Sequence, residues 1–433
     1  MESNARLLRR PLSFVQVRYD GLVWRGRIYF TPSYRRTSNF QLIPLILYPQ
    51  YLKMPIDFNK IPSPSFVLDE SLLKRNLEII QGIAAESDVK IILALKGFAM
   101  HSVFPLINQY ISATTASSVH EARLGFEEFG EEVHAYAPAY LDSEFDQWMS
   151  YCSHMTFNSL NQYNRFIDKV LASGKDIQCG IRINPAYAEV SNDLYNPCVP
   201  GSRLGVRADA FGETLPKGIT GLHFHTLCES DSYALEKTLT AVEEKFGHLL
   251  KQCTWVNFGG GHLMTSQGYN TEHLIEVLKK FKSKYPHLEV ILEPGAAFAW
   301  QTGYLLSTVQ DVFESDGIEA VILDISVAAH MPDCLEMPYT PTIRGIKEAK
   351  EEEKRTRVGG TSCLAGDYVG DYYFPKGIAI GDQLIFEDMM HYTMVKTNFF
   401  NGVKHPSIAV WRQDDTLDIV KTFAYEDFKN KLS

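Results

Sequence analysis

Short apolar runs alternate with amphipathic helical stretches between about residue 66 and residue 300. This alternation is typical of repeated β/α units around a parallel sheet, because each strand buried on both faces reads as a continuous apolar run. The stretches that follow residues 158 and 269 are the clearest helices, with apolar residues at spacings of three and four. Eight strand candidates predict a (β/α)8 barrel: residues 90–96, 111–115, 133–138, 154–158, 178–184, 221–226, 255–260 and 289–295.

The sequence changes character after Gln301, where strand-like segments are separated by turn residues and long helices are few. We therefore expect a C-terminal all-β domain that the extended segment PSPSFVL (62–68) completes. The strand-like segments are residues 303–313, 318–325, 382–388, 392–396 and 407–413. The predicted domains are a barrel of residues 73–300 and a β-domain of residues 54–72 plus 301–433.

Composition places the 433-residue chain among soluble enzymes, since 45% of residues are hydrophobic and 22% are charged. The net charge of −10 argues against nucleic acid or a membrane surface as a partner and weakly favours a cationic substrate. Seven scattered cysteines without a CxxC pair fit a reducing cytosol, so we expect a cytoplasmic protein and no metal site.

The first 53 residues differ from the rest in charge. They carry +7, from eight Arg and one Lys against two acidic residues, so the remainder carries −17. An Arg-rich, acid-poor leader is typical of an organellar presequence, but its prolines and aromatics make a poor amphipathic helix. The preferred interpretation is that the native protein starts at Met54 and that residues 1–53 are an atypical basic extension outside it.

Polar residues lie at the C-terminal ends of five predicted barrel strands: Lys96, Arg182, His225, the triplet Gly259, Gly260 and Gly261, and Glu293. Barrel enzymes build their active sites at this face, so we expect these residues to converge on one mouth. Four of these five have an ordinary alternative: a lysine that reaches solvent at the rim, a tight turn of glycines, a Glu-Pro-Gly turn, and a hydrogen-bonded core histidine.

Together these residues point to one cofactor. A desolvated lysine can form a Schiff base, a histidine ring can stack on a flat ring, and glycines can cradle a phosphate. An acid can stabilise a protonated pyridine ring, which then acts as an electron sink. Pyridoxal 5'-phosphate needs all four, and zinc ligation by His223 and His225 is disfavoured because no third ligand has convincing spacing.

From about Ile61 to the C-terminus the sequence resembles the fold-type III pyridoxal-phosphate decarboxylases, which act on ornithine, arginine and diaminopimelate. Within that family it is most similar to the carboxynorspermidine/carboxyspermidine branch, through FHTLCE (224–229), MPDCLEMPY (331–339) and SCLAGD (362–367). The remaining segments that carry the resemblance are IPSPSFVLDE (61–70), ILALKGFA (92–99), SSVHEARLG (117–125), YNPCVPGSRLGV (195–206), NFGGGHLMT (257–265), LEPG (292–295), AHMPDCLEMPY (329–339), GGTSCLAGD (359–367) and NFFNG (398–402).

The resemblance implies roles for individual residues. Lys96 would attach the cofactor covalently, His225 would stack on its ring, Gly259 to Gly261 and Tyr392 would hold its phosphate, and Glu293 would face the ring nitrogen. Arg182 is a further cofactor-binding candidate. Cys363 would reach the active site of a partner subunit in a homodimer and protonate the substrate carbon after carbon dioxide leaves. Candidates for binding the distal amine of a carboxylated triamine are Asp333, Glu336 and Asp367.

Two departures from the family pattern bear on the phosphate contacts, and the second also points away from the ornithine and diaminopimelate enzymes. Ala296 follows Glu-Pro-Gly where many relatives have Arg and the carboxynorspermidine branch is expected to have Glu, and Cys228 and Glu229 stand where ornithine and diaminopimelate enzymes have Gly-Ser. The expected activity is decarboxylation of carboxynorspermidine or carboxyspermidine. The alternatives are an ornithine, lysine or diaminopimelate decarboxylase and, from a different class, a non-catalytic pyridoxal-phosphate carrier.

Overall fold

The computed structural model describes residues 15–19, 22–26, 56–130, 132–190 and 192–433. The chain divides into two units, residues 1–54 and 55–433. In the first unit, β1 (Val15–Tyr19) pairs antiparallel with β2 (Leu22–Gly26). The rest of the basic extension predicted for residues 1–53 lies outside the described residues. Among the described residues, no helix combines the length and apolarity needed to cross a membrane.

A protein that begins at Met54 is expected to match the full chain in melting temperature and turnover. The reason is that residues 55–433 form a unit separate from residues 1–54, and the charge of the chain changes sign at the same point. Thermal denaturation and decarboxylation assays on the two proteins test this. A lower melting temperature or turnover in the shorter protein would assign residues 1–53 to the working enzyme.

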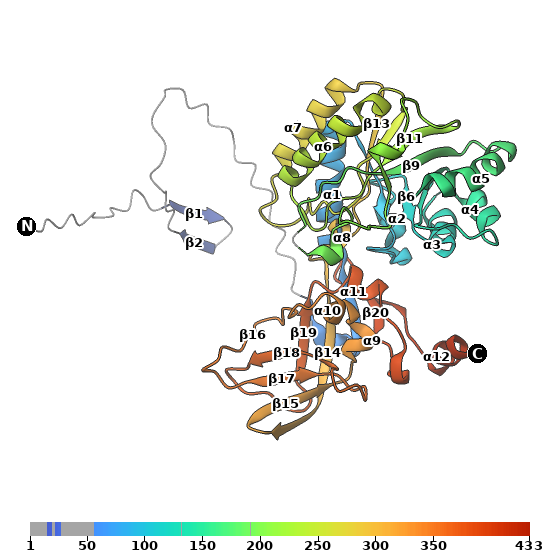
Figure 1. Cartoon of the computed structure of the whole chain (residues 1–433). Coiled ribbons are helices and arrows are strands. Elements are labelled where there is room, and N and C mark those ends of the chain that lie inside the picture. The colour runs from blue at the N-terminus through green and yellow to red at the C-terminus, as the bar shows by residue number, and fades with distance from the viewer. Residues whose placement is uncertain (1–14, 20–21, 27–55, 131, 191) are drawn as a thin grey trace, which may run out of the picture. The chain divides into compact units, whose positions relative to one another are not determined.

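Parallel strands make up one large sheet, in the order β4-β13-β12-β11-β9-β8-β7-β6-β5, with β10 attached to β9 (Figure 1). All eight predicted barrel strands are confirmed, each within a few residues of its predicted bounds. The strands of the whole sheet, in which β4 and β5 divide one predicted strand and β10 is additional, are β4 (Lys90–Ile91), β5 (Leu93–Ala94), β6 (Thr114–Ala116), β7 (Val133–Tyr136), β8 (His154–Phe157), β9 (Gln178–Asn184), β10 (Val206–Arg207), β11 (Ile219–His223), β12 (Trp255–Asn257) and β13 (Glu289–Leu292).

One run of residues, 90–95, joins the two edges of this sheet. Its backbone N–H groups donate alternately to the two sides. Those of Ile92 and Ala94 donate to the carbonyls of Leu292 and Pro294, at 2.9 and 3.0 Å. Those of Leu93 and Leu95 donate to the carbonyls of Ala113 and Thr115, both at 3.1 Å. The predicted strand 90–96 therefore appears as two short strands, because its two halves pair with different neighbours. The run ends directly before Lys96.

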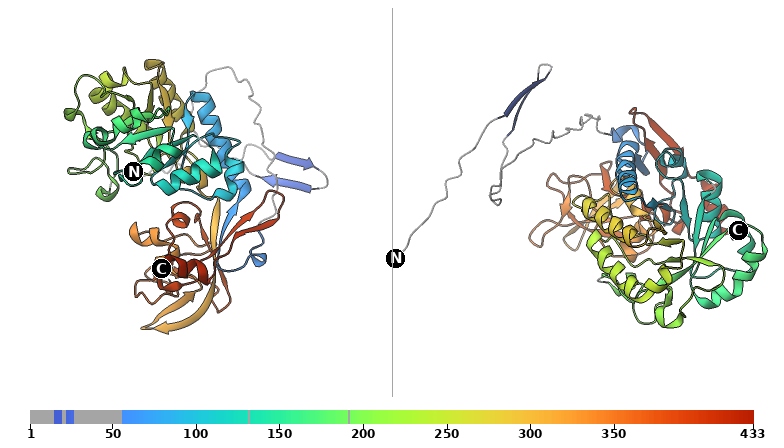
Figure 2. Two further views of the ribbon diagram at one scale, coloured as in Figure 1. Left: turned by 90° about the vertical axis from the view of Figure 1, so that its right-hand side faces the viewer. Right: turned by 90° about the horizontal axis from the view of Figure 1, so that it is seen from above.

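Helices cover the outside of the barrel, and α7 packs between α1 and α6 (Figures 1 and 2). Their apolar faces supply much of the core, for example Leu73, Leu77 and Ile80 on α1. The helices predicted after residues 158 and 269 are confirmed as α5 and α7. The helices of this region are α1 (Glu70–Ser87), α2 (Phe104–Ile107), α3 (Val119–Leu124), α4 (Phe145–Tyr151), α5 (Leu160–Ala172), α6 (Ser232–Leu250), α7 (Thr271–Lys284) and α8 (Ala296–Ala299).

A second, mixed sheet follows the barrel, in the order β16-β18-β17-β15-β14-β3-β20-β21, with β19 paired to β14. The prediction that the segment 62–68 completes this sheet is confirmed, since β3 lies between β14 and β20. Its strands are β3 (Ser65–Asp69), β14 (Gly303–Ser315), β15 (Ile318–Leu323), β16 (Lys347–Glu348), β17 (Thr356–Gly359), β18 (Tyr368–Tyr373), β19 (Gln383–Glu387), β20 (Ser407–Trp411) and β21 (Leu417–Lys421).

One predicted strand of this region is wrong. Residues 392–396 favour a strand by composition, but Tyr392–Val395 form the short helix α11. Tertiary contact overrides the local preference here, because the Thr393 hydroxyl donates to the buried carboxylate of Asp333 at 2.7 Å. The β-domain also contains the helices α9 (Val327–His330), α10 (Pro332–Glu336) and α12 (Tyr425–Leu432).

Candidate active site

Lys96 lies just beyond β5, at the C-terminal end of the barrel strands, as predicted. A close contact between two glycines sets its position, since a Cβ on Gly97 would lie 2.8 Å from the Cα of Gly295. Only backbones without side chains allow the turn after Lys96 to press against the Glu-Pro-Gly turn in this way. Burial lowers the pKa of Lys96, partly opposed by the carboxylate of Glu293. The amine is therefore shifted towards its neutral, nucleophilic form.

Glu293 follows β13 and is 5% exposed. Its Oε1 lies 3.0 Å from His223 Nε2, and its Oε2 accepts a hydrogen bond of 3.0 Å from Asn257 Nδ2. Burial acts to raise the pKa of Glu293, but His223 and the positive charge of Lys96 outweigh it and hold the pKa below its usual range. The barrel mouth thus contains a buried, ionised carboxylate whose two oxygens are fixed by neighbouring strands.

His225 and the glycine triplet also meet at this mouth. His225 Nδ1 lies 2.9 Å from the Gly260 nitrogen, and Arg182 Nη2 donates to the His225 carbonyl at 2.9 Å. The Arg182 guanidinium lies over the ring of Tyr136, 4.7 Å from its centre, in a cation–π contact that helps to hold it in place. The triplet has room for no side chain: a Cβ on Gly259 or Gly261 would lie 2.4 or 2.1 Å from a backbone oxygen.

Two further polar groups face the same space. Burial raises the pKa of Tyr392 to about 12, and the carboxylates that add to the effect include those of Glu229 and Glu121. Tyr392 is the first residue of α11 in the β-domain, and Glu293 of the barrel mouth is among the charges that act on its pKa. Glu121 was not predicted from the sequence. Its carboxylate accepts from the Ser117 N–H at 2.6 Å, burial raises its pKa, and Lys96 opposes that shift.

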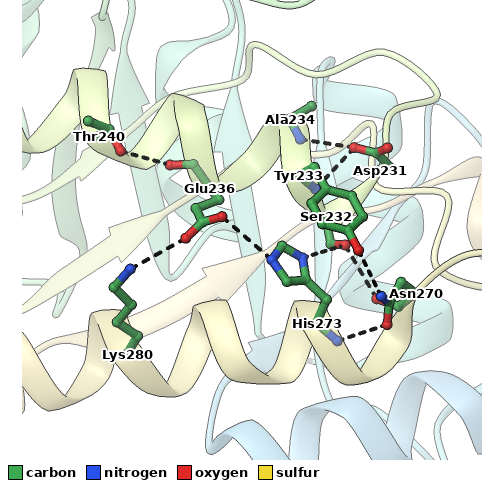
Figure 3. Close-up of polar contacts among 9 residues, drawn as sticks. All are labelled: Asp231, Ser232, Tyr233, Ala234, Glu236, Thr240, Asn270, His273 and Lys280. Atoms are coloured by element: carbon green, nitrogen blue, oxygen red, sulfur yellow. Dashed lines mark hydrogen bonds and ion pairs between the residues drawn. The ribbon is translucent and has the colours of Figure 1, made fainter. Parts of the chain in front are cut away.

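The segment after His225 leads into a cavity of about 410 Å³ that Cys228, Glu229 and Asp231 help to line. Asp231 caps α6 by accepting from the N–H groups of Tyr233 and Ala234, at 3.0 and 2.9 Å. Figure 3 shows how α6 is tied in turn to α7, where His273 Nδ1 lies 2.9 Å from the Ser232 hydroxyl. The lining segment 228–231 is thus anchored at its C-terminal end, where Asp231 caps α6.

The remaining predicted residues lie in the β-domain. Cys363 is exposed on the loop between β17 and β18. Asp367 ends the same loop and is 4% exposed; its carboxylate accepts from the Ser326 hydroxyl and from the N–H groups of Ala328 and Ser362, at 3.0, 2.8 and 3.0 Å. Its oxygens are therefore already engaged within the chain, and its predicted contact with an amine stays a prediction.

Asp333 and Glu336 lie together on α10. Asp333 accepts from the Tyr339 hydroxyl at 2.8 Å, in addition to its bond from Thr393, while its Oδ1 is buried without a hydrogen-bond partner among the described residues. Glu336 carries an exposed ion pair with Lys396, and its carbonyl accepts from the hydroxyl of Tyr195, a residue of the cavity lining, at 3.3 Å. Both acids therefore stay candidates for contact with a cationic ligand.

The residues at the barrel mouth fit pyridoxal phosphate. The glycine triplet packs directly on neighbouring backbone where a Cβ would collide, so its own backbone is left without side chains, and the neighbouring His262 has both ring nitrogens buried without a partner among the described residues. An amine with a lowered pKa and an ionised, oriented carboxylate complete the donor set that this cofactor requires. The chemical match rests on three separate barrel segments.

A family model described as the pyridoxal-dependent decarboxylase, C-terminal sheet domain, matches residues 65–390. The chain belongs to the pyridoxal-dependent decarboxylases. Its decarboxylase class and its fold of a barrel followed by a sheet domain, both predicted above, are thereby confirmed. The match includes Lys96, His225, Glu293 and Cys363 within its span.

Individual decarboxylases match most of the chain. A carboxyaminopropylagmatine decarboxylase of Synechocystis sp. is 50% identical over 374 residues, which cover 86% of this chain and 96% of the relative. A carboxynorspermidine/carboxyspermidine decarboxylase of Campylobacter jejuni is 39% identical, covering 86% and 98%. The crystal structure of carboxynorspermidine decarboxylase from Campylobacter jejuni, complexed with norspermidine, superposes with a TM-score of 0.78 at 38% identity, covering 86% and 100%.

Proposed function

We propose that this decarboxylase removes the α-carboxylate of a carboxylated polyamine, either carboxynorspermidine or carboxyspermidine. The observation that carries the proposal is the acidic character of the cavity beside Cys228, to which Glu189, Glu229 and Asp231 contribute. Glu189 is paired with Lys237 at 2.7 Å and Asp231 caps α6, which leaves Glu229 as the carboxylate best placed for a ligand. The names of the relatives support the same class of substrate.

The proposed roles follow from the geometry of the barrel mouth. When bound, the cofactor supplies the electron sink for the departing carboxylate. Lys96 would hold it covalently, His225 would stack on it, and the glycine triplet with Tyr392 would bind its phosphate. Glu293, kept ionised and oriented by His223 and Asn257, would hold the proton on the ring nitrogen. Glu229 would pair with the distal cation, because a desolvated ammonium without a partner costs several kcal/mol. Glu336 would join it only by giving up its ion pair with Lys396.

We further propose a homodimer in which Cys363 of one subunit protonates the substrate carbon in the other subunit's site. The exposure of Cys363, on a loop of the β-domain rather than on the barrel, supports this arrangement. A cytoplasmic location is also proposed. It is supported by seven cysteines that are all free, as expected in a reducing compartment.

A second substrate candidate ends in a guanidinium group. The most identical of the relatives described above acts, by its name, on carboxyaminopropylagmatine. A planar guanidinium can bind a carboxylate through two parallel hydrogen bonds, whereas an ammonium is a point charge, so the same acidic cavity suits both. The two candidates share the reacting end of the molecule and differ chiefly in the distal cation, an ammonium in one and a guanidinium in the other.

The test is a substrate panel assayed for carbon dioxide release by the cofactor-loaded enzyme. It contains the two carboxylated triamines, carboxyaminopropylagmatine, ornithine, lysine and diaminopimelate. The carboxylated polyamines are expected to exceed the three amino acids in kcat/KM by at least about tenfold, as for one lost charge-assisted contact. Faster turnover of ornithine, lysine or diaminopimelate would refute the polyamine substrate and leave the decarboxylase fold standing.

Asp367→Asn is expected to impair the loop that carries Cys363. The amide keeps one acceptor oxygen but turns the other position into a donor that faces the N–H groups and hydroxyl now bound. The expected cost is about 1 to 3 kcal/mol of folding free energy, together with a fall in kcat. Urea denaturation and steady-state kinetics measure both. A tenfold rise in KM with unchanged stability and kcat would instead favour direct contact between Asp367 and the substrate amine.

A further inference from the structure

A second cluster of functional side chains lies at the opposite end of the barrel from the active site. His134 is the second residue of β7 and His154 is the first residue of β8, whereas Lys96 and Glu293 follow the C-terminal ends of their strands. His134 and His154 are direct partners in the register of these parallel strands, so their side chains leave the sheet on the same side. Their rings stack with centres 3.9 Å apart and planes 12° apart.

Glu132 completes this cluster. Its Oε1 lies 3.1 Å from His134 Nε2, and one ligand atom from each of Glu132, His134 and His154 lies within 4.8 Å of the other two. The His134 side chain is 5% exposed and that of Glu132 is 27% exposed, so the cluster is held by the sheet yet open to solvent at one side. The sequence predicts no metal site, since it has no CxxC pair and no third ligand spaced to join His223 and His225; this cluster is made of other residues.

We propose that Glu132, His134 and His154 form a binding site for a divalent transition-metal ion of the Zn²⁺ type. Two imidazoles and one carboxylate are a donor set that Zn²⁺, Co²⁺ and Ni²⁺ favour, whereas Mg²⁺ and Ca²⁺ prefer oxygen alone. Bonds of about 2.0–2.2 Å place tetrahedral ligand atoms somewhat more than 3 Å apart. The three ligand atoms lie within 4.8 Å of one another, and the two rings are stacked, so at least one imidazole has to turn out of the stack for both nitrogens to reach one ion. Water would fill the position on the open side.

Lys90 is the internal competitor of the metal. Its ammonium forms an ion pair with Glu132 and lies 3.7 Å from a second carboxylate, that of Glu289. When Glu132 turns towards a metal ion, Lys90 keeps Glu289 as a partner and is not left without a counter-charge. The ion therefore has to displace one contact of the ammonium, and removal of the Lys90 charge should strengthen metal binding.

The occupied site would join the starts of β7 and β8 to Glu132, which precedes β7. It lies on the barrel face where residues serve stability rather than chemistry in enzymes of this fold. An ion that binds only the folded protein raises the melting temperature with increasing concentration. The expected effect is thus on stability, with the rate of decarboxylation unchanged.

The experiment uses the full chain, loaded with cofactor and freed of metal by a chelator. Titration with Co²⁺, followed by its visible d–d absorption, reports a tetrahedral site with nitrogen ligands, and calorimetry with Zn²⁺ gives the affinity. The expected result is one equivalent bound with a saturable rise in melting temperature. His154→Gln and Glu132→Gln should each weaken Zn²⁺ at least tenfold, and Lys90→Gln should strengthen it.

Two controls separate this site from other ligands on the chain. His248→Gln removes an exposed histidine at the end of α6, and Cys363→Ser removes the exposed thiol; both should leave the affinity unchanged. The proposal is overturned if no saturable binding occurs, if the tightest site survives both His154→Gln and Glu132→Gln, or if Cys363→Ser abolishes it. Weaker binding by the Lys90→Gln protein would also overturn it, because that lysine would then support the site.

Discussion

Lys96→Ala is expected to lose the visible absorption band of the bound cofactor and to reduce decarboxylation by at least about a thousandfold, as for the loss of a covalent catalytic group. The reason is geometric as well as chemical. Lys96 is held against the Glu-Pro-Gly turn by the contact of Gly97 with Gly295, and its amine has a lowered pKa beside Glu293. Absorption spectra of the purified protein and the rate of carbon dioxide release measure the two losses.

Two variants sharpen this test. Lys96→Arg keeps a positive charge near Glu293 but cannot form the covalent bond, so it should be as inactive as Lys96→Ala. Lys90→Gln alters the lysine at the start of the same strand run, on the far side of the barrel, and should retain both the band and the activity. The Lys96→Ala protein could instead keep a normal absorption band, with a cofactor that borohydride still attaches permanently to it. That result would mean that another lysine holds the cofactor.

Mixing inactive Lys96→Ala subunits with inactive Cys363→Ala subunits is expected to restore activity to about a quarter of the native value, because random exchange makes half of the dimers mixed and each mixed dimer has one intact site. The expectation rests on the proposed homodimer and on the placement of the two residues, one at the barrel mouth and one on an exposed loop of the β-domain.

Subunit exchange is verified independently with two differently tagged proteins. A matched mixture of Lys96→Ala with Lys96→Arg has no intact site in any dimer and should stay inactive. If exchange is complete and the Lys96→Ala and Cys363→Ala mixture also stays inactive, then both residues serve the same chain's site and Cys363 does not act across an interface.

The sequence alone was sufficient for the barrel because strand and helix periods are local properties. The eight apolar runs and the helices after residues 158 and 269 appear where their patterns place them. The division of residues 90–95 between two neighbours was not predictable, since it depends on closure of the whole sheet. Residues 392–395 likewise became a helix through the bond of Thr393 to Asp333, which is 60 residues away in sequence.

The active site shows the same distinction. Lys96, His225 and Glu293 are predictable candidates because each follows a buried strand, where a polar side chain needs a partner or a function. His223 and Asn257, which orient Glu293, were not assigned that role, because the contact depends on three neighbouring strands. Glu121 had only a weak local signal, the Ser-x-x-Glu spacing in which the Ser118 hydroxyl accepts from the Glu121 N–H at 3.1 Å.

The closure of the barrel by residues 90–95 has a consequence for the enzyme's dynamics. The four amides of Ile92, Leu93, Ala94 and Leu95 bridge the two edges of the sheet directly before the lysine proposed to anchor the cofactor. Local opening of this short segment would break the sheet and displace Lys96 in one event. Cofactor loading should therefore slow hydrogen–deuterium exchange at these four amides more than elsewhere in the barrel. Exchange at the closure of the barrel would then report whether the enzyme holds its cofactor.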